Sequence, residues 1–197
     1  MLHRLNRFPV TTPEIRPTGG HAIQNKRGIS QVFSPTKRAT DSLVRDATVF
    51  DVFDISRVLI ESITQLCQAD HGNDPDMLAE WIANKSPEDI RLWIESGSIL
   101  SVCDWNGRIS AVGLAQANGG ISLLYVAPDA VGHGLGRVLL QALEAQLWQA
   151  GHRQIHLTAT RSALSFYQSQ GWSRSGPATN CFGLPGQPMR KLLQPAG

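Results

Sequence analysis

The stretch "LLYVAPDAVGHGLGRVLLQALE", residues 123–144, constrains the fold more than any other part of the sequence. A run of β-prone residues is stopped by Pro128, a loop carries glycine at 132, 134 and 136, and an apolar helical pattern follows. A strand that enters a helix through such a loop leaves backbone N–H groups unpaired at the helix start, where the helix dipole also favours negative charge. The stretch therefore predicts a phosphate-binding loop, and a glycine turn that only packs the helix onto the sheet is the alternative.

The surrounding sequence predicts an α/β fold. Asn-Gly pairs at 106–107 and 118–119 separate β-prone runs and predict an antiparallel three-stranded meander that ends at Val126. Residues 153–160, "RQIHLTAT", form a strand reached through a crossover helix, so we expect it to lie parallel to the strand at 123–126. Helices are predicted over 52–66, from Pro75, from Pro87 and over the short segment "SALSFYQSQG", 162–171, whereas "ADHGNDPD", 69–76, is predicted as a polar break.

The length of 197 residues, 42% of them hydrophobic, allows one sizeable core. Residues 1–40 contain a single acid, Glu14, and no sustained periodicity. We therefore predict a disordered basic leader over residues 1–41 and one domain over residues 42–197. An organelle transit peptide and an overlong start are the alternatives for the leader.

Charge and cysteine content exclude several classes of function. A formal net charge of +2 is too small to indicate a nucleic-acid or membrane surface, and no apolar run approaches the roughly 20 residues of a membrane span. Cys67, Cys103 and Cys181 are far apart and lack metal-ligand spacing, as is typical of buried thiols in a reducing compartment. We expect a cytoplasmic protein with no metal ion and no nucleic-acid or membrane partner.

The loop does not carry a known nucleotide motif. A Walker loop needs Lys and a hydroxyl residue after its last glycine, but Arg137 and Val138 follow Gly136. A Rossmann fingerprint needs GxGxxG and an acid at the end of the next strand, whereas this loop reads GxGxG and no acid follows "HLTAT".

The two elements together resemble the GNAT superfamily of acetyl-CoA-dependent N-acetyltransferases. Its [RQ]xxGx[GA] motif falls on Val131 to Gly136, and its later "A…FY…GF" element falls on Ala163, Phe166, Tyr167, Gly171 and Trp172. Val131 stands where Arg or Gln is usual, Thr160 where Asn is frequent, and Trp172 where Phe is usual. The resemblance covers roughly residues 44–193. It implies a mixed, mostly antiparallel sheet with a splayed parallel pair at its centre and helices on both faces.

The resemblance also implies a function and a site. Acetyl-CoA is the implied co-substrate, a primary amine of a small molecule or peptide attacks it directly, and family members often pair as homodimers. Tyr167 is the implied acid for the departing thiolate, and the backbone N–H of Val126 polarises the thioester carbonyl. The implied acetyl-CoA-binding residues are Leu124, Tyr125, Val126, Val131, Gly132, His133, Gly134, Leu135, Gly136, Arg137, Thr160 and Phe166.

The acceptor side is less defined. Some members of the family carry a carboxylate at the start of the motif strand, which here is Gly120. Asp70 and His71 are candidates for substrate contact, as are Asp74 and Asp76, and a water chain is the alternative to a side-chain base. The missing acid leaves a non-catalytic acetyl-CoA-binding module as the alternative function.

Overall fold

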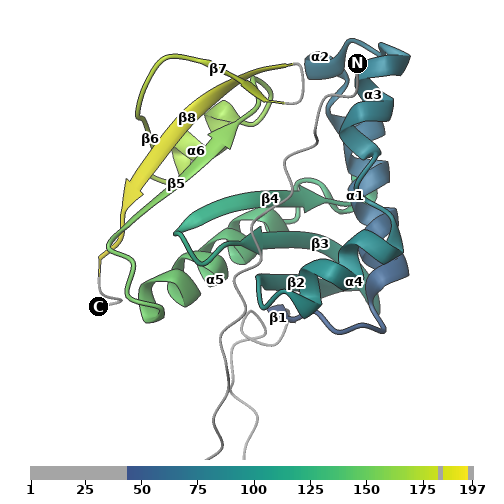
Figure 1. Ribbon diagram of the computed structural model, residues 1–197, viewed down its shortest axis with the longest axis horizontal. Coiled ribbons are helices and arrows are strands. Elements are labelled where there is room, and N and C mark those ends of the chain that lie inside the picture. The colour runs from purple at the N-terminus through teal and green to yellow at the C-terminus, as the bar shows by residue number, and fades with distance from the viewer. Residues whose placement is uncertain (1–43, 182–183, 195–197) are drawn as a thin grey trace, which may run out of the picture. The chain divides into compact units, whose positions relative to one another are not determined.

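A mixed sheet forms the centre of the fold in the computed structural model, which describes residues 44–181 and 184–194. Its strand order is β1-β2-β3-β4-β5-β8-β6, with β7 paired to β8 (Figure 1). All neighbouring strands are antiparallel except β4 and β5, as the resemblance implies. The strands are β1 Val44–Asp46, β2 Ile99–Trp105, β3 Arg108–Ala115, β4 Gly120–Val126, β5 Gln154–Ala159, β6 Ser173–Arg174, β7 Thr179–Cys181 and β8 Leu184–Leu192. The predicted leader lies outside the described residues.

The predicted meander is confirmed as β2, β3 and β4. Asn106 and Gly107 join β2 to β3 with φ values of 52° and 77°, which is the left-handed backbone that favours Asn-Gly in a two-residue hairpin. Register shifts interrupt both pairings, the second of them between Leu114 and Ala115 opposite the start of β4.

Six α-helices and one 3₁₀ turn surround the sheet within the described residues. The predicted helices over 52–66, from Pro75 and from Pro87 are confirmed, and Ser86 forms a capping box with Asp89. The predicted polar break was partly wrong, because it contains a one-turn helix. Leu66, the last residue of the predicted helix over 52–66, is 40% exposed. The elements are α1 Val52–Leu66, α2 Gln68–His71, α3 Pro75–Ile82, α4 Pro87–Glu95, η1 Pro128–Ala130, α5 Leu135–Gln149 and α6 Leu164–Ser169.

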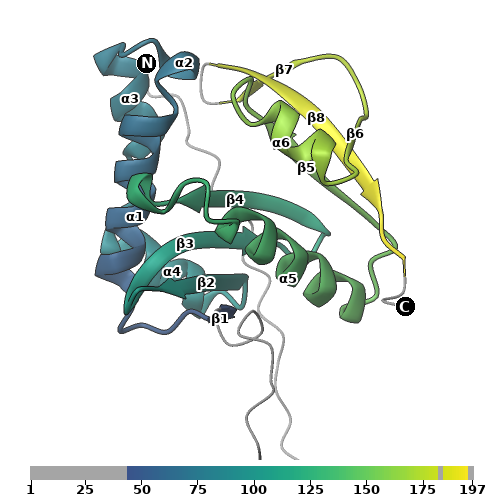
Figure 2. The ribbon, with the colours of Figure 1, turned by 180° about the vertical axis from the view of Figure 1, so that it is seen from behind.

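Helices cover both faces of the sheet. In Figure 1 α4 lies in front of β2 and β3, and Figure 2, from behind, brings α5 to the front. A Cβ at Gly113 on β3 would lie 2.7 Å from Leu143 of α5, so helix and strand are in close contact there. None of the helices among the described residues is long and apolar enough to cross a membrane.

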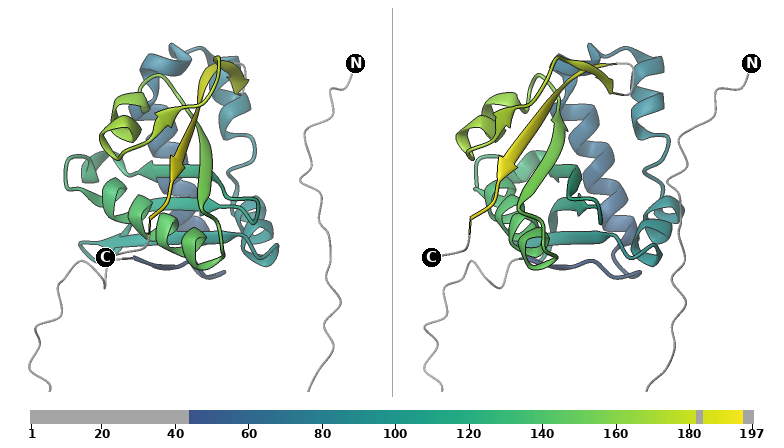
Figure 3. Two further views of the ribbon diagram at one scale, coloured as in Figure 1. Left: turned by 90° about the vertical axis from the view of Figure 1, so that its left-hand side faces the viewer. Right: turned by 60° about the vertical axis from the view of Figure 1, so that its left-hand side comes forward.

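The parallel pair separates soon after it begins. Pairing between β4 and β5 is confined to Gly120 with His156 and Ile121 with Leu157. The expected pairing along 123–126 is therefore absent, and Figure 3 shows β5 and β8 running steeply across the direction of β3 and β4. The splayed centre implied by the resemblance is confirmed, and it leaves the second half of β4 without a strand on that side.

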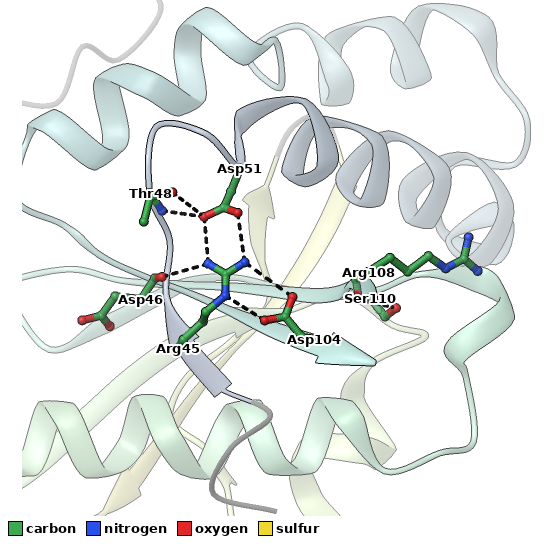
Figure 4. A network of polar contacts seen from close by, with 7 residues as sticks. All are labelled: Arg45, Asp46, Thr48, Asp51, Asp104, Arg108 and Ser110. Carbon is green, nitrogen blue, oxygen red and sulfur yellow. Dashed lines mark hydrogen bonds and ion pairs between the residues drawn. The ribbon is translucent and has the colours of Figure 1, made fainter. Parts of the chain in front are cut away.

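Arg45 joins three elements at the other edge of the sheet (Figure 4). Its guanidinium donates to both carboxylate oxygens of Asp51 at 2.8 and 2.9 Å, and its Nε donates to Asp104 at 2.7 Å. Asp51 precedes α1 and also accepts from the Thr48 amide at 2.7 Å. Arg45 and Thr48 lower the pKa of Asp51 to about 2.

We expect Asp51→Asn to lower the free energy of unfolding at pH 7 by about 1 kcal/mol, because the Arg45 side chain is 41% exposed and solvent screens the pair. The pKa of Asp51 is depressed in the folded protein, so its ionised carboxylate stabilises the fold fully at pH values above the ordinary pKa of 3.8. This contribution is lost as the pH falls through about 2. Urea unfolding of the original protein and of Asp51→Asn, at pH 7 and at pH 2–4, measures this contribution. Glu61→Gln, which breaks the i,i+4 pair with Arg57 within α1, is the control, and an equal loss there would contradict the prediction.

Candidate functional site

The β4–α5 loop presents its backbone to open space. Gly132 and Gly134 have φ values of 86° and 79°, and a Cβ at either position would meet no atom within 4 Å. Gly134 is the N-cap of α5 and provides no side-chain hydrogen bond to the first turn. The amides at the start of α5 therefore face a space that an anion can occupy.

Gly136 differs from the other two glycines. A Cβ there would lie 3.4 Å from Val126 and 3.7 Å from Phe166, which is ordinary packing distance. The position has room for a methyl group between β4 and α6. Gly136 therefore brings the loop, the end of β4 and α6 together, in addition to its predicted role in exposing amides.

The side chains of the loop are held by neighbouring elements. The His133 ring stacks on Trp105 at the end of β2, with 4.5 Å between ring centroids. Arg137 is exposed, and its Nε donates to Gln170 at 3.0 Å, which keeps a positive charge beside the loop. Val131 is exposed and Leu135 is buried, so the Leu135 side chain is not available to a ligand.

The free edge of β4 faces the region from which β5 diverges. The Ala127 amide donates to Ser110 on β3 at 2.8 Å, and amides alternate in direction along a strand. The amides of Val126 and Leu124 therefore point away from β3, toward that region. The Tyr125 side chain lies on the opposite face from the Val126 side chain, and its hydroxyl accepts from the Trp81 indole at 3.1 Å.

Tyr167 lies on α6 and is buried. Its ring centroid is 5.2 Å from that of Phe166 and 5.9 Å from that of Trp172. Burial raises the pKa of Tyr167 above its ordinary value of 10, which favours the neutral phenol. The Tyr167 hydroxyl has no hydrogen-bond partner among the described residues. Every fully buried side-chain N or O atom of those residues does have one. The residue as a whole is 7% exposed, and no described protein group accepts the proton of its hydroxyl.

The two acceptor-side candidates lie in different environments. His71 is 1% exposed, its Nε2 is 3.1 Å from the Ile63 carbonyl, and its Nδ1 accepts from the Asn73 amide at 3.1 Å. Both ring nitrogens are thus committed to the main chain. Asp70 is half-buried, and its carboxylate accepts from the amide and hydroxyl of Ser162, just before α6.

The remaining predicted positions are explained by packing. Thr160, at the end of β5, has its hydroxyl 3.2 Å from that of Ser162. At Gly120 a Cβ would lie 3.0 Å from both His156 Nε2 and Asn118 Oδ1, so a carboxylate side chain would displace them. Asp74 caps α3 through two amides, which accounts for its carboxylate without a ligand.

Two tryptophans contact predicted site residues that the sequence does not connect with them. Trp81 and Tyr125 are 44 positions apart, and Trp105 and His133 are 28 apart, so no local pattern could have paired them. The thiols of Cys67 and Cys103 are protonated, since burial raises their pKa values to about 12 and 11. Among the described residues no group of three or more His, Cys, Asp or Glu side chains could hold a metal ion.

Two surface hollows lie away from these residues. The larger, about 710 Å³, is lined by α5 and the end of β8, including Trp148 and Leu192. The other, about 350 Å³, lies between β1, β2, α4 and the end of α5. Neither includes the glycine loop or Tyr167, so the candidate site consists of the free edge of β4, the loop and α6 and not of either hollow.

Comparison with known proteins yields one family and a consistent fold. The family model described as "Acetyltransferase (GNAT) domain" matches residues 68–193. No curated protein matches the sequence.

Three solved structures illustrate the similarity, and at these identities they show the fold alone. A GCN5-related N-acetyltransferase from Rhodopseudomonas palustris is 23% identical, with 76% of this chain and 94% of that chain covered and a TM-score of 0.68. PaiA N-acetyltransferase from Thermoplasma acidophilum, solved with coenzyme A, is 18% identical, with 76% and 98% covered and a TM-score of 0.62. YncA from Salmonella typhimurium, solved with acetyl-CoA, is 19% identical, with 78% and 95% covered and a TM-score of 0.56.

Proposed function

Because the chain belongs to the GNAT acetyltransferase family, we propose that it transfers an acetyl group from acetyl-CoA to a primary amine of a small molecule or peptide. One observation carries the proposal. A Cβ at Gly136 would lie within packing distance of both Val126 and Phe166, so the glycine loop, a free strand edge and the helix of Tyr167 meet at one place. Two of the similar structures were solved with coenzyme A or acetyl-CoA, which supports the same ligand here.

The loop would bind the pyrophosphate. A Cβ at Gly132 or Gly134 would meet open space, so an anion could reach the amides at the start of α5, and Arg137 adds a positive charge at the same helix start. The Trp105 stack holds the His133 ring beside these amides. The residues present therefore fit a phosphate-containing ligand.

The free edge of β4 would align the pantetheine arm. Its amides and carbonyls at 124 and 126 point to the side where β5 has diverged, so an extended amide-containing chain can pair there as an added strand. This pairing directs the thioester to the centre of the sheet.

Direct attack requires a neutral amine, a polarised carbonyl and a proton for the departing thiolate. The Val126 amide would donate to the thioester oxygen. Tyr167 would donate its proton to the sulfur as the C–S bond breaks and the C–N bond forms, and a buried neutral phenol suits this role. Deprotonation of the amine falls to solvent, because Asp70 and His71 are engaged by protein groups and residue 120 is glycine.

A ligand comparison tests the binding half of the proposal. We expect acetyl-CoA and CoA, at about 100 times their Kd, to stabilise the protein by about 2.7 kcal/mol and to raise its melting temperature by about 5 °C or more. ATP and NAD at equal concentration serve as controls, and a larger rise with either would contradict the proposal.

Release of free thiol from acetyl-CoA with a panel of primary amines tests the catalytic half. Turnover with at least one amine is expected. A rise in melting temperature with no thiol release across the panel would instead identify a non-catalytic acetyl-CoA-binding module.

A further inference from the structure

We infer that Asp70 is a positioning residue that holds the start of α6 and, through it, the hydroxyl of Tyr167. The inference rests on the proposed function, in which Tyr167 is the acid, and it assigns to α2 a role in the chemistry of a distant helix.

Helix α6 cannot hold its own position. It has six residues, and no side chain caps its N-terminus. A helix this short is unstable by itself, because few hydrogen bonds offset the cost of nucleation. Its placement therefore depends on contacts made outside the helix.

The C-terminal side of α6 is fixed by a buried polar group. Trp172 is 3% exposed, its indole donates to Glu144 of α5 at 2.9 Å, and Lys191 of β8 donates to the same carboxylate at 2.7 Å. The Tyr167 ring packs against Trp172. These contacts fix the ring of Tyr167 from one side only.

The N-terminal side is fixed from α2, 92 residues earlier in the chain. The Ser162 amide donates to Asp70 Oδ1 at 3.1 Å, and the Ser162 hydroxyl donates to Asp70 Oδ2. Beside them the Arg161 guanidinium donates to the Ala69 carbonyl. In Figures 1 and 2 α2 lies at the C-terminal end of α1, where β4 and β5 have diverged.

Helix α2 is a firm support for these bonds. The buried ring of His71 joins it to the Ile63 carbonyl of α1 and to the Asn73 amide, and it contacts Trp81 edge-on. A continuous series of contacts thus runs from α1 through His71 and Asp70 to Ser162. Ser162 is five residues before Tyr167, so its displacement would move the phenol relative to the Val126 amide.

A double-mutant cycle distinguishes positioning from general stabilisation. We expect Asp70→Ala to lower kcat by roughly tenfold with little change in KM for acetyl-CoA, because small misplacement of a catalytic group costs rate. Asp70→Asn retains an acceptor for the Ser162 amide and should stay within about threefold of the original kcat. Added to Tyr167→Phe, Asp70→Ala should cause no further loss, since both act through one proton donor.

The cycle uses the fastest amine of the panel and Glu80→Ala as the control, an exposed acid on α3. Additive losses would overturn the inference. So would a rise in KM for the amine with unchanged kcat, because it would place Asp70 against the substrate. A Tyr167→Phe variant with full activity would overturn the proposed acid instead.

Hydrogen exchange gives a readout that needs no turnover. Asp70→Ala removes two hydrogen bonds, so amide exchange over residues 164–169 should accelerate by about tenfold, while Glu80→Ala should leave it unchanged. Unchanged exchange in Asp70→Ala would show that α6 does not depend on α2.

Discussion

Gly134→Val is expected to weaken CoA binding by roughly 10²-fold or more. In the folded protein a side chain at this position would project into the open space in front of the α5 amides. Hydrogen bonds to a charged phosphate are worth about 1.5–3 kcal/mol each, so the loss of two suffices for this change. Isothermal titration with CoA measures it directly.

Gly97→Val is the matched control, because it separates loss of the site from backbone strain. Gly97 also has a positive φ, 74°, and open space around its missing Cβ, but it lies after α4. Both variants should lose stability to a similar extent, since valine is strained at positive φ. Only Gly134→Val should lose CoA affinity, and equal affinities in the two variants would remove the loop from the binding site.

Tyr167→Phe is expected to lower kcat by about 10²-fold while the Kd for CoA changes little, in the range of a positioned general acid. The ring contacts with Phe166 and Trp172 are kept, so the fold should not change. The steady-state rate of thiol release from acetyl-CoA gives kcat, and titration with CoA gives Kd. Ser169→Ala, which removes an exposed hydroxyl from the same helix, is the control and should retain full activity.

The pH profile adds an independent check on the same residue. Burial raises the pKa of Tyr167 above 10, and an acid must be protonated to act. The rate should therefore show no descending limb from this group up to about pH 10. If Tyr167→Phe lost CoA affinity by the same factor as kcat, the role of Tyr167 would be structural.

Much of the fold follows from local patterns. Backbone preferences set by a few neighbouring residues account for three features. These are the Asn-Gly turn at 106–107, the helices that begin at Pro75 and Pro87, and the strand–loop–helix unit at 123–144. They predict the meander, the helices and the glycine loop. The same locality explains the error at 69–76, because a polar segment between helices gives no periodic signal for a single helical turn such as α2.

The site is partly predictable for the same reason. The loop residues and Tyr167 are adjacent to recognisable motifs, so their presence is visible in sequence. The environments of the Asp70 carboxylate and the His71 ring are not visible in the sequence. Both belong to one polar segment, yet the tertiary structure buries His71 and ties Asp70 to Ser162.

The sequence by itself determined the order of the elements, the open amides of the loop and the neutral phenol available at Tyr167. Only the tertiary structure decided that Gly136 comes close to Val126 and Phe166, that β4 and β5 separate after two residue pairs, and that Asp70 of α2 is bonded to Ser162 next to α6. The physical reason is separation along the chain. Backbone propensities act over a few residues, whereas these contacts join segments 10 to 92 positions apart and depend on how the sheet and its helices pack.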